Sequence, residues 1–515
     1  MYTSTNGTGW SSGCNSGWVF SSPANYSAPC LGWYGVTCNS QCNVTQISLY
    51  SCQLSGTIPS QLGYMTSIQD LDLSSNSLSG TIPTDLRLLS SMTQLWLQYN
   101  SLTGTIPIEL GLMTSIQLLI LASNSLTGTL PTQLGYITSM QGLDIYDNSL
   151  TGTIPSQLGL LINMTGLYLY SNSLTGTIPS ELSNLTSMIA FELADNSLTG
   201  TIPTQLGYMT NMQDLLLAGN SLTGTIPREL GYMTSMAYLL LYGNSLTGTI
   251  PTELGCMSGM IQLYLYDNSL TGTIPTQLGY MNSIQVLYLY SNSLIGTIPS
   301  QLGTMTSMQY LDLNSNSLTG TIPSSILLWQ QLFYVYLQNN NFIGTVPSTI
   351  MTLSYLNSIN LSNNRQLSGN IQSLFSINTS SSLQYIILSN MDLTGSLSDE
   401  LFGLPQLQTL VLSSNHISGT LPASVCTSSL TSLFLDGIGI SSTRGQGFHG
   451  SIPSCIFSSN LSTLHLAGNG LTGPLPKVPE SSPISSLTVA RNRLTGNHRM
   501  CISNSTSHHH HYYTR

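Results

Sequence analysis

Charged side chains are scarce in this sequence. Only 5% of its residues are Asp, Glu, Lys or Arg, against about 25% in an ordinary soluble domain. The chain has one lysine, Lys477, and a formal net charge of -10. This composition argues against a nucleic-acid partner, because binding to phosphates requires a dense basic surface.

Long apolar runs are also missing. No stretch of about 20 apolar residues is present, so we predict no membrane-spanning segment. Met1 is followed directly by the polar residues Tyr2, Thr3 and Ser4. We therefore read the sequence as a mature or trimmed form that carries no signal peptide.

The residue patterns of catalysis and metal binding are absent as well. There is no CxxC pair with a nearby set of histidines, so neither a metal site nor a cofactor is predicted. No paired acid and base, nucleophile elbow or phosphate loop is found, so the chain is not expected to be an enzyme. The histidines His508–His511 near the C-terminus leave two readings open, a weak metal-binding tail or a disordered end.

The sequence does contain a repeat. Asn recurs every 24 residues from Asn76 to Asn364, and the unit reads L-x-x-L-x-L-x-x-N-x-L-x-G-x-I-P-x-x-L-G-x-M-x-x. The L-x-L segment has the period of a strand, so its leucines point inward and the residues between them point outward. An Asn in an apolar core must be hydrogen-bonded, which predicts a ladder of Asn side chains along the stacked coils. Pro ends strand pairing and begins a short helical segment.

The two ends of the repeat array depart from this pattern. Cys52 occupies the Asn position one repeat before Asn76, so we predict that Cys52 replaces a ladder residue and forms no disulfide. Beyond Asn364 the spacing loosens, and the next Asn residues stand at Asn390, Asn415, Asn469 and Asn492.

The repeat unit resembles the plant-type leucine-rich repeat of polygalacturonase inhibitors and receptor-kinase ectodomains. Trp10, Trp18, Pro29-Cys30 and the segment 33–38 (WYGVTC) are similar to the N-terminal cap signature of that family. The resemblance implies an α/β repeat solenoid, a right-handed curved superhelix with a parallel β-sheet on its concave side and short 3-10 helices or loops on its convex side. The domains expected are a cap at 1–43, regular repeats at 44–364, irregular repeats at 365–496 with an inserted loop at 437–450, and a C-terminal cap and tail at 497–515.

The cysteines cluster toward the two ends of the chain, as disulfide-closed solenoid caps require. We expect the pairs Cys30–Cys38, Cys14–Cys42 and Cys426–Cys455. For Cys256 two readings stay open, a free thiol or an intermolecular bond, and Cys501 has no predicted partner.

Tyrosines gather at outward positions of the predicted concave strands. An aromatic group on a solvent-facing surface is informative, because tyrosine is enriched at protein-binding hot spots and also stacks on sugar rings. The densest block runs from Tyr242 to Tyr290; the alternative is that β-propensity and repeat duplication placed these residues. The predicted ligand-binding residues are Trp96, Tyr146, Tyr168, Tyr170, Tyr238, Tyr242, Tyr264, Tyr266, Tyr288, Tyr290, Tyr310, Tyr334 and Tyr336.

Threonine forms a second regular array. Thr follows the Gly of each repeat from Thr57 to Thr345, and most repeats also have Thr before that Gly. Such Thr-Gly-Thr ladders are similar to those of ice-binding solenoids, although β-propensity alone also accounts for them.

These features together predict an extracellular or cell-surface scaffold without enzymatic activity that binds a protein or glycan through its tyrosine-rich concave face. Two alternatives remain, a structural subunit of a glycoprotein filament that self-assembles end to end, and an ice-binding protein. N-linked glycans are expected at nine sequons. These are Asn6, Asn25, Asn43, Asn163, Asn184, Asn360, Asn378, Asn460 and Asn504.

Overall fold

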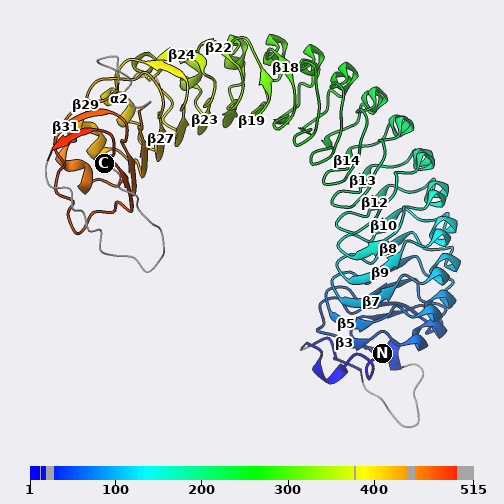
Figure 1. Ribbon diagram of the computed structural model, residues 1–515. Helices are drawn as coiled ribbons and strands as arrows, with labels where there is room; N and C mark the ends of the chain where they lie inside the picture. The colour runs from blue at the N-terminus through cyan, green and yellow to red at the C-terminus, as the bar shows by residue number, and fades with distance from the viewer. Residues whose placement is uncertain (12, 19–27, 376–378, 438–446, 496–515) are drawn as a thin grey trace. The chain divides into compact units, whose positions relative to one another are not determined.

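A computed structural model describes residues 1–11, 13–18, 28–375, 379–437 and 447–495. The chain divides into two compact units, Met1–Ser269 and Leu270–Arg515, here called the first and second unit. In each unit the chain winds through successive coils (Figure 1), and a coil contributes one short strand to a parallel sheet and one short helix to the opposite side. The predicted fold class, a leucine-rich-repeat solenoid, is confirmed.

In the described part of the first unit the strands form a main sheet and a flanking sheet. Its main strands are β1 (Val36–Cys38), β2 (Val44–Ser48), β4 (Asp70–Asp72), β6 (Gln94–Trp96), β8 (Leu118–Ile120), β10 (Gly142–Asp144), β12 (Gly166–Tyr168), β13 (Ala190–Glu192), β14 (Asp214–Leu216), β15 (Tyr238–Leu240) and β16 (Gln262–Tyr264). A flanking sheet contains β3 (Ser55–Thr57), β5 (Ser77–Gly80), β7 (Ser101–Thr105), β9 (Ser125–Thr129) and β11 (Ser149–Thr151). All pairs are parallel except β1 with β2, which is antiparallel.

The helices of the first unit are single 3-10 turns. They are η1 (Gly7–Gly9), η2 (Ala28–Leu31), η3 (Ser60–Tyr64), η4 (Thr84–Leu88), η5 (Ile108–Leu112), η6 (Thr132–Tyr136), η7 (Ser156–Leu160), η8 (Ser180–Asn184), η9 (Thr204–Tyr208), η10 (Arg228–Tyr232) and η11 (Thr252–Cys256). From η3 onward a proline precedes each helix with φ near the value that its ring imposes, as at Pro155 with φ -67°.

The second unit repeats this plan less regularly. Its main strands are β17 (Val286–Tyr288), β19 (Tyr310–Asp312), β21 (Tyr334–Tyr336), β23 (Ser358–Asn360), β25 (Tyr385–Ile387), β27 (Thr409–Val411), β28 (Ser432–Phe434), β30 (Thr463–His465) and β32 (Ser486–Thr488). Shorter flanking strands are β18 (Ile295–Gly296), β20 (Ser317–Leu318), β22 (Ile343–Thr345), β24 (Gln366–Asn370), β26 (Asp392–Thr394), β29 (His449–Gly450), β31 (Gly470–Pro474) and β33 (Arg493–Thr495). The helices are η12 (Thr276–Tyr280), η13 (Ser300–Thr304), η14 (Ser324–Leu328), η15 (Ser348–Thr352), α1 (Ile371–Leu374), α2 (Asp399–Phe402), η16 (Ala423–Thr427) and η17 (Ser454–Ser458).

The predicted Asn ladder is present. The Asn76 amide nitrogen donates to the carbonyl oxygens of Leu49 at 2.8 Å and Leu73 at 3.0 Å, and its oxygen accepts from the backbone N–H groups of Cys52 and Leu54. Each Asn thus satisfies polar backbone groups in its own coil and in the preceding coil. These bonds let apolar side chains such as Leu73 remain fully buried beside the turns.

Asn390, the next Asn after the regular spacing ends, is not a ladder residue. The buried residue at the ladder position of that coil is Met391, while Asn390 has φ +54° and donates to the side chain of Asn363. Methionine offers no amide, so the N–H of Leu367 bonds instead to the carbonyl of Asn364 at 2.9 Å. The ladder resumes at Asn415.

The predicted disulfide Cys14–Cys42 is wrong, and so is the prediction that Cys52 forms none. The disulfides join Cys14 to Cys52, Cys30 to Cys38, and Cys426 to Cys455, the last two as expected. Described cap residues lie beside the coil of Cys52, where later coils have a preceding coil.

Cap residues accordingly make the bonds that a preceding coil would make. The carbonyl oxygens of Ser4 and Thr5 accept from Thr57 and Ser55, and the carbonyl of Cys52 accepts from Ser11. Cys14 is thereby held 5.7 Å from Cys52 between Cα atoms. Cys42 lies in an exposed turn and is free, as is the exposed Cys256.

No helix in the described part of the chain is long and apolar enough to cross a membrane. Most of the predicted inserted loop lies outside the described residues. Cys501 and the histidine tail lie entirely outside them.

Candidate functional site

The outward side chains of the main strands form a surface that we call the sheet face. In the first unit the strand register places Asp144, Tyr168 and Glu192 in one column along adjacent coils. The predicted ligand residues of this unit are half-buried, with part of each ring open to solvent. They are Trp96, Tyr146, Tyr168, Tyr170, Tyr238, Tyr242, Tyr264 and Tyr266.

Two stacked tyrosine pairs stand on the sheet face of the first unit. Tyr146 and Tyr170 have ring centroids 4.4 Å apart and nearly parallel planes. The rings of Tyr242 and Tyr266 are also nearly parallel, with centroids 4.4 Å apart. In the coils between these pairs the equivalent positions are Ala194 and Ala218. We call this stretch the alanine gap; at about 4.8 Å per coil, Tyr170 and Tyr242 stand three coils, or about 14 Å, apart with only alanines at the positions between them.

The carboxylates Glu192 and Asp214 lie in the two coils of the alanine gap, and Asp144 lies in the coil of Tyr146. Burial raises the pKa of Asp144 to about 6, and burial together with the nearby charges of Asp214 and Asp144 raises the pKa of Glu192 to about 7. The pKa of Asp214 is raised by burial too. Within the described residues, none of these three forms an ion pair with a basic side chain. They are therefore partly desolvated acids without a counter-ion, which favours the approach of a cation.

Tyr99 belongs to this surface, although the sequence reading missed it. Its φ is +58°, a conformation that a bulky side chain adopts at a steric cost, and its hydroxyl lies 3.0 Å from that of Tyr146. Ala122, in the coil between them, is small enough to allow this contact. The signal in the sequence was an aromatic residue where most other coils have Ser, Asp, Asn or Gly.

The block from Tyr242 to Tyr290 is divided between the two units. In the second unit Tyr288, Tyr310, Tyr334 and Tyr336 are joined through Tyr334, with ring centroids 6.1, 4.9 and 4.6 Å from it. Tyr290 lies 6.2 Å from Tyr288. Asp312 stands in the same column as Tyr288, and burial raises its pKa to about 6. The second unit therefore carries an aromatic cluster of its own.

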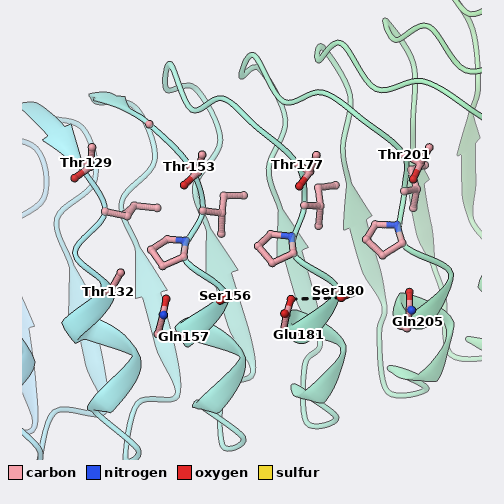
Figure 2. A pocket seen from close by; sticks show the side chains of 18 of the residues that line it. Thr129, Thr132, Thr153, Ser156, Gln157, Thr177, Ser180, Glu181, Thr201 and Gln205 are labelled. Atoms are coloured by element: carbon pink, nitrogen blue, oxygen red, sulfur yellow. Dashed lines mark hydrogen bonds between the residues drawn. The ribbon is translucent and has the colours of Figure 1, made fainter.

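A second surface lies on the flank of the first unit. A groove of about 1070 Å³ runs across four coils (Figure 2), and it continues into one of about 610 Å³ toward Glu253. Three of the coils contribute Thr, Ile, Pro and then a polar residue at the start of a 3-10 helix, as in Thr153, Ile154, Pro155 and Ser156, and the first coil contributes Thr129, Leu130 and Thr132. We call this surface the threonine groove.

The two threonines of each Thr-Gly-Thr segment have different roles. The first donates its hydroxyl to the backbone of the preceding coil, as Thr175 does to the Gly152 carbonyl at 3.2 Å. The second turns its methyl group onto the next glycine: a Cβ at Gly176, where φ is +77°, would lie 2.7 Å from the Thr153 methyl carbon. Figure 2 shows the hydroxyl oxygens of Thr129, Thr153 and Thr177 pointing the same way. Packing thus fixes a row of hydroxyls that have no partner among the described residues.

The sequons lie in several environments. Five are exposed, Asn6, Asn43, Asn163, Asn184 and Asn460, whereas Asn360 is half-buried on β23. Asn25, Asn378 and Asn504 fall outside the described residues. Among the described residues, no group of His, Cys, Asp and Glu is arranged to hold a metal ion.

Comparison with known proteins identifies leucine-rich repeats in this chain. The Leucine Rich Repeat family model matches residues 67–89, 163–185, 283–305, 307–328 and 406–428. No curated protein sequence matches the chain.

Solved structures match over most of the chain. The PEPR1–AtPEP1 crystal structure is 30% identical with a TM-score of 0.85 and covers 93% of this chain, which spans 66% of that one. The Arabidopsis receptor kinase HAESA was solved with the peptide hormone IDA and the co-receptor SERK1. It is 30% identical to this chain with a TM-score of 0.76, and the match covers 95% of this chain and 89% of the HAESA chain. An LRR protein of Leptospira interrogans is 31% identical to this chain with a TM-score of 0.56. The match covers 70% of this chain and 88% of the Leptospira chain.

Proposed function

Because the chain belongs to the leucine-rich-repeat family, with repeats of the plant type, we propose that it is a ligand-binding scaffold whose sheet face holds a basic segment of a peptide or protein. The observation that carries this proposal is the alanine gap, which has stacked tyrosines at both ends and unpaired carboxylates beside it. A Lys or Arg side chain in the gap would meet aromatic faces and negative charge together. HAESA, a similar structure, was solved with a peptide hormone.

Apolar neighbours extend the binding surface. Leu216 and Leu240 follow Glu192 in the central column, and both are half-buried with their side chains on the sheet face. A ligand segment that combines a basic residue with apolar ones therefore fits this surface better than a neutral polysaccharide does.

The proposal is tested by selecting binders from a displayed library of short random peptides on the intact protein. We expect enrichment of sequences with Lys or Arg beside apolar residues, and we expect Ala194→Trp, which fills the gap, to lose those binders. The matched control is Gln213→Trp, at an exposed position of the neighbouring coil, which should retain them. Binders without basic residues, or binders that Ala194→Trp retains, would contradict the proposal.

Binding of such a peptide should strengthen as pH rises from 5 to 8. The carboxyls of Asp144 and Glu192 have pKa values of about 6 and 7, so both are largely protonated and neutral at pH 5 and ionised at pH 8. A cationic ligand prefers the ionised forms, and its binding releases protons. We expect the Kd to fall by at least about tenfold over this range, measured by titration calorimetry. Glu192→Gln should flatten the profile, and a native profile that does not depend on pH would refute the role of these acids.

We also propose that the chain works outside the cell and carries N-linked glycans. The disulfides of the described residues support an oxidising compartment, and the five exposed sequons have room for a glycan. The exposed Asn163 and Asn184 lie in neighbouring coils opposite the sheet face, so glycans there would leave the alanine gap open.

A second candidate function is ice binding through the threonine groove. It is favoured by the row of hydroxyls that packing holds in one orientation at the spacing of the coils. The double variant Thr153→Val and Thr177→Val keeps the methyl contacts and removes two hydroxyls. If the groove organises water, this variant should allow ice recrystallisation that the native protein suppresses. The matched control, Thr151→Val with Thr175→Val, removes two hydroxyls that donate to backbone carbonyls and do not belong to the row, and it should still suppress recrystallisation. Unimpeded ice growth in the presence of the native protein would eliminate the candidate.

A further inference from the structure

Three polar side chains meet on the sheet face of the second unit. Asp436 follows β28, His465 ends β30 and Ser486 begins β32, so adjacent strands of the parallel sheet supply them. The His465 Nε2 atom lies 3.0 Å from the Ser486 hydroxyl oxygen, and the Nδ1 atom lies 3.7 Å from an Asp436 carboxylate oxygen. The His465 imidazole therefore lies between the Ser486 hydroxyl and the Asp436 carboxylate.

The surroundings fix this arrangement. The other oxygen of Asp436 accepts from the backbone N–H of Ala467 at 2.7 Å and from the hydroxyl of Thr488 at 3.3 Å. The His465 ring packs edge-on against Phe434, with centroids 4.7 Å apart. The carboxylate favours the tautomer of His465 with its proton on Nδ1, which leaves the Nε2 lone pair to accept from Ser486.

We propose that Ser486, His465 and Asp436 form a nucleophilic triad that hydrolyses carboxylic esters, an activity separate from peptide binding in the first unit. His465 Nε2 takes the proton of the Ser486 hydroxyl while the oxygen attacks the ester carbonyl. The tetrahedral intermediate expels the alcohol, which receives that proton from His465, and an acyl-serine remains. Water then attacks the acyl-serine with His465 again as the base; the acid leaves, and the serine regains its proton. Asp436 is a positioning residue that touches no substrate.

A hydroxyl donor, Thr463, stands beside the nucleophile. Thr463 on β30 and Ser432 on β28 are in register with Ser486, so their side chains share its column on the sheet face. Within the described residues, neither hydroxyl has a hydrogen-bond partner. Thr463, on the strand next to that of Ser486, is placed to donate to the oxyanion that develops there, whereas Ser432 lies two strands away, at about 9.6 Å. The 3.7 Å separation of His465 and Asp436 exceeds a hydrogen bond, as is frequent in sites without substrate.

Solvent can reach the site. The side chains of His465 and Asp436 are 24% and 33% exposed, and Ser486 is half-buried. A small ester can therefore approach the nucleophile without a conformational change.

No sequence motif joins these three residues, so the proposed activity departs from the expectation that the chain is not an enzyme. Asp436, His465 and Ser486 lie in three consecutive coils of unequal length, and only the sheet register aligns them.

The test is covalent labelling of the full chain with a fluorophosphonate probe, in which the serine oxygen displaces fluoride from phosphorus. We expect the adduct on Ser486, located by mass spectrometry of the digested protein. The variant Ser486→Ala should lose it, and His465→Gln should form it at least about a hundredfold more slowly. Hydrolysis of p-nitrophenyl acetate should fall in parallel.

Ser485→Ala is the matched control, because Ser485 is exposed and its hydroxyl donates only to the Ser462 carbonyl; labelling should be unchanged. Circular dichroism verifies that each variant is folded. No adduct on the folded native protein overturns the proposal. So does an adduct on Ser486 that forms equally fast in His465→Gln, since the histidine would then not activate the serine.

Discussion

Replacing Asn364 by alanine should lower the free energy of unfolding of the second unit by about 4 kcal/mol. Asn364 is fully buried. Its amide nitrogen donates to the carbonyl oxygens of Leu337 at 3.0 Å and Leu361 at 2.8 Å, and its oxygen accepts from the N–H of Phe342 at 3.1 Å. The variant leaves these three backbone groups buried without partners, at about 1–3 kcal/mol each, partly offset by local relaxation.

Denaturant unfolding measures this loss, and hydrogen exchange localises it. The Phe342 amide should lose protection in Asn364→Ala, because its acceptor is gone. The matched control is Asn282→Ala in the same unit, where the side chain is exposed and the change should stay within about 0.5 kcal/mol. Equal free energies of unfolding for the two variants would show that the ladder hydrogen bonds contribute little to stability.

Removing the two tyrosines that face the alanine gap should weaken peptide binding by at least about a hundredfold. Tyr170 and Tyr242 belong to different stacked pairs, so each truncation removes one aromatic end of the gap. A tyrosine at the centre of an interface contributes about 2 kcal/mol, and a double truncation therefore exceeds the factor of a hundred. The partner rings Tyr146 and Tyr266 also lose their stacking contacts.

The measurement is the Kd of a selected basic peptide for Tyr170→Ala with Tyr242→Ala. The control removes the same number of tyrosines from the outer side of the first unit, as Tyr208→Ala with Tyr232→Ala, where the rings are 63% and 49% exposed. The control should bind like the native protein. If both double variants bind equally well, the ligand site lies elsewhere.

The repeat made the fold predictable from the sequence. The period of 24 residues, the L-x-L strand and the buried Asn each fix local structure, and together they give the coil and its ladder. Where one residue interrupts the period, the pattern misleads: Asn390 lies one position before the ladder site that Met391 fills. Cys52 was misassigned because its partner Cys14 belongs to the cap, whose path over the first coil follows from no repeat.

The candidate sites were predictable only in part. Outward columns follow from strand period, so Tyr146 and Tyr170 were found. The gap between the tyrosine pairs was not, because it depends on small residues, Ala194 and Ala218, that carry no chemical signal themselves. The desolvation of Glu192 is likewise a property of its neighbours in adjacent coils.

The ladder bonds run in one direction, and this has a consequence for how such a chain evolves. Each Asn side chain reaches back to the coil before it, as Asn76 does to Leu49 and Asn492 does to Leu466. The hydrogen bonds of an inner coil are therefore satisfied by adjacent coils of the same kind. They do not depend on how many coils the array contains. A tandem duplication of one repeat-length of coding sequence inserts a coil whose bonds are satisfied at once. Growth of the array and divergence of its surface residues can thus proceed independently, whereas the cap with its Cys14–Cys52 bond must be inherited unchanged.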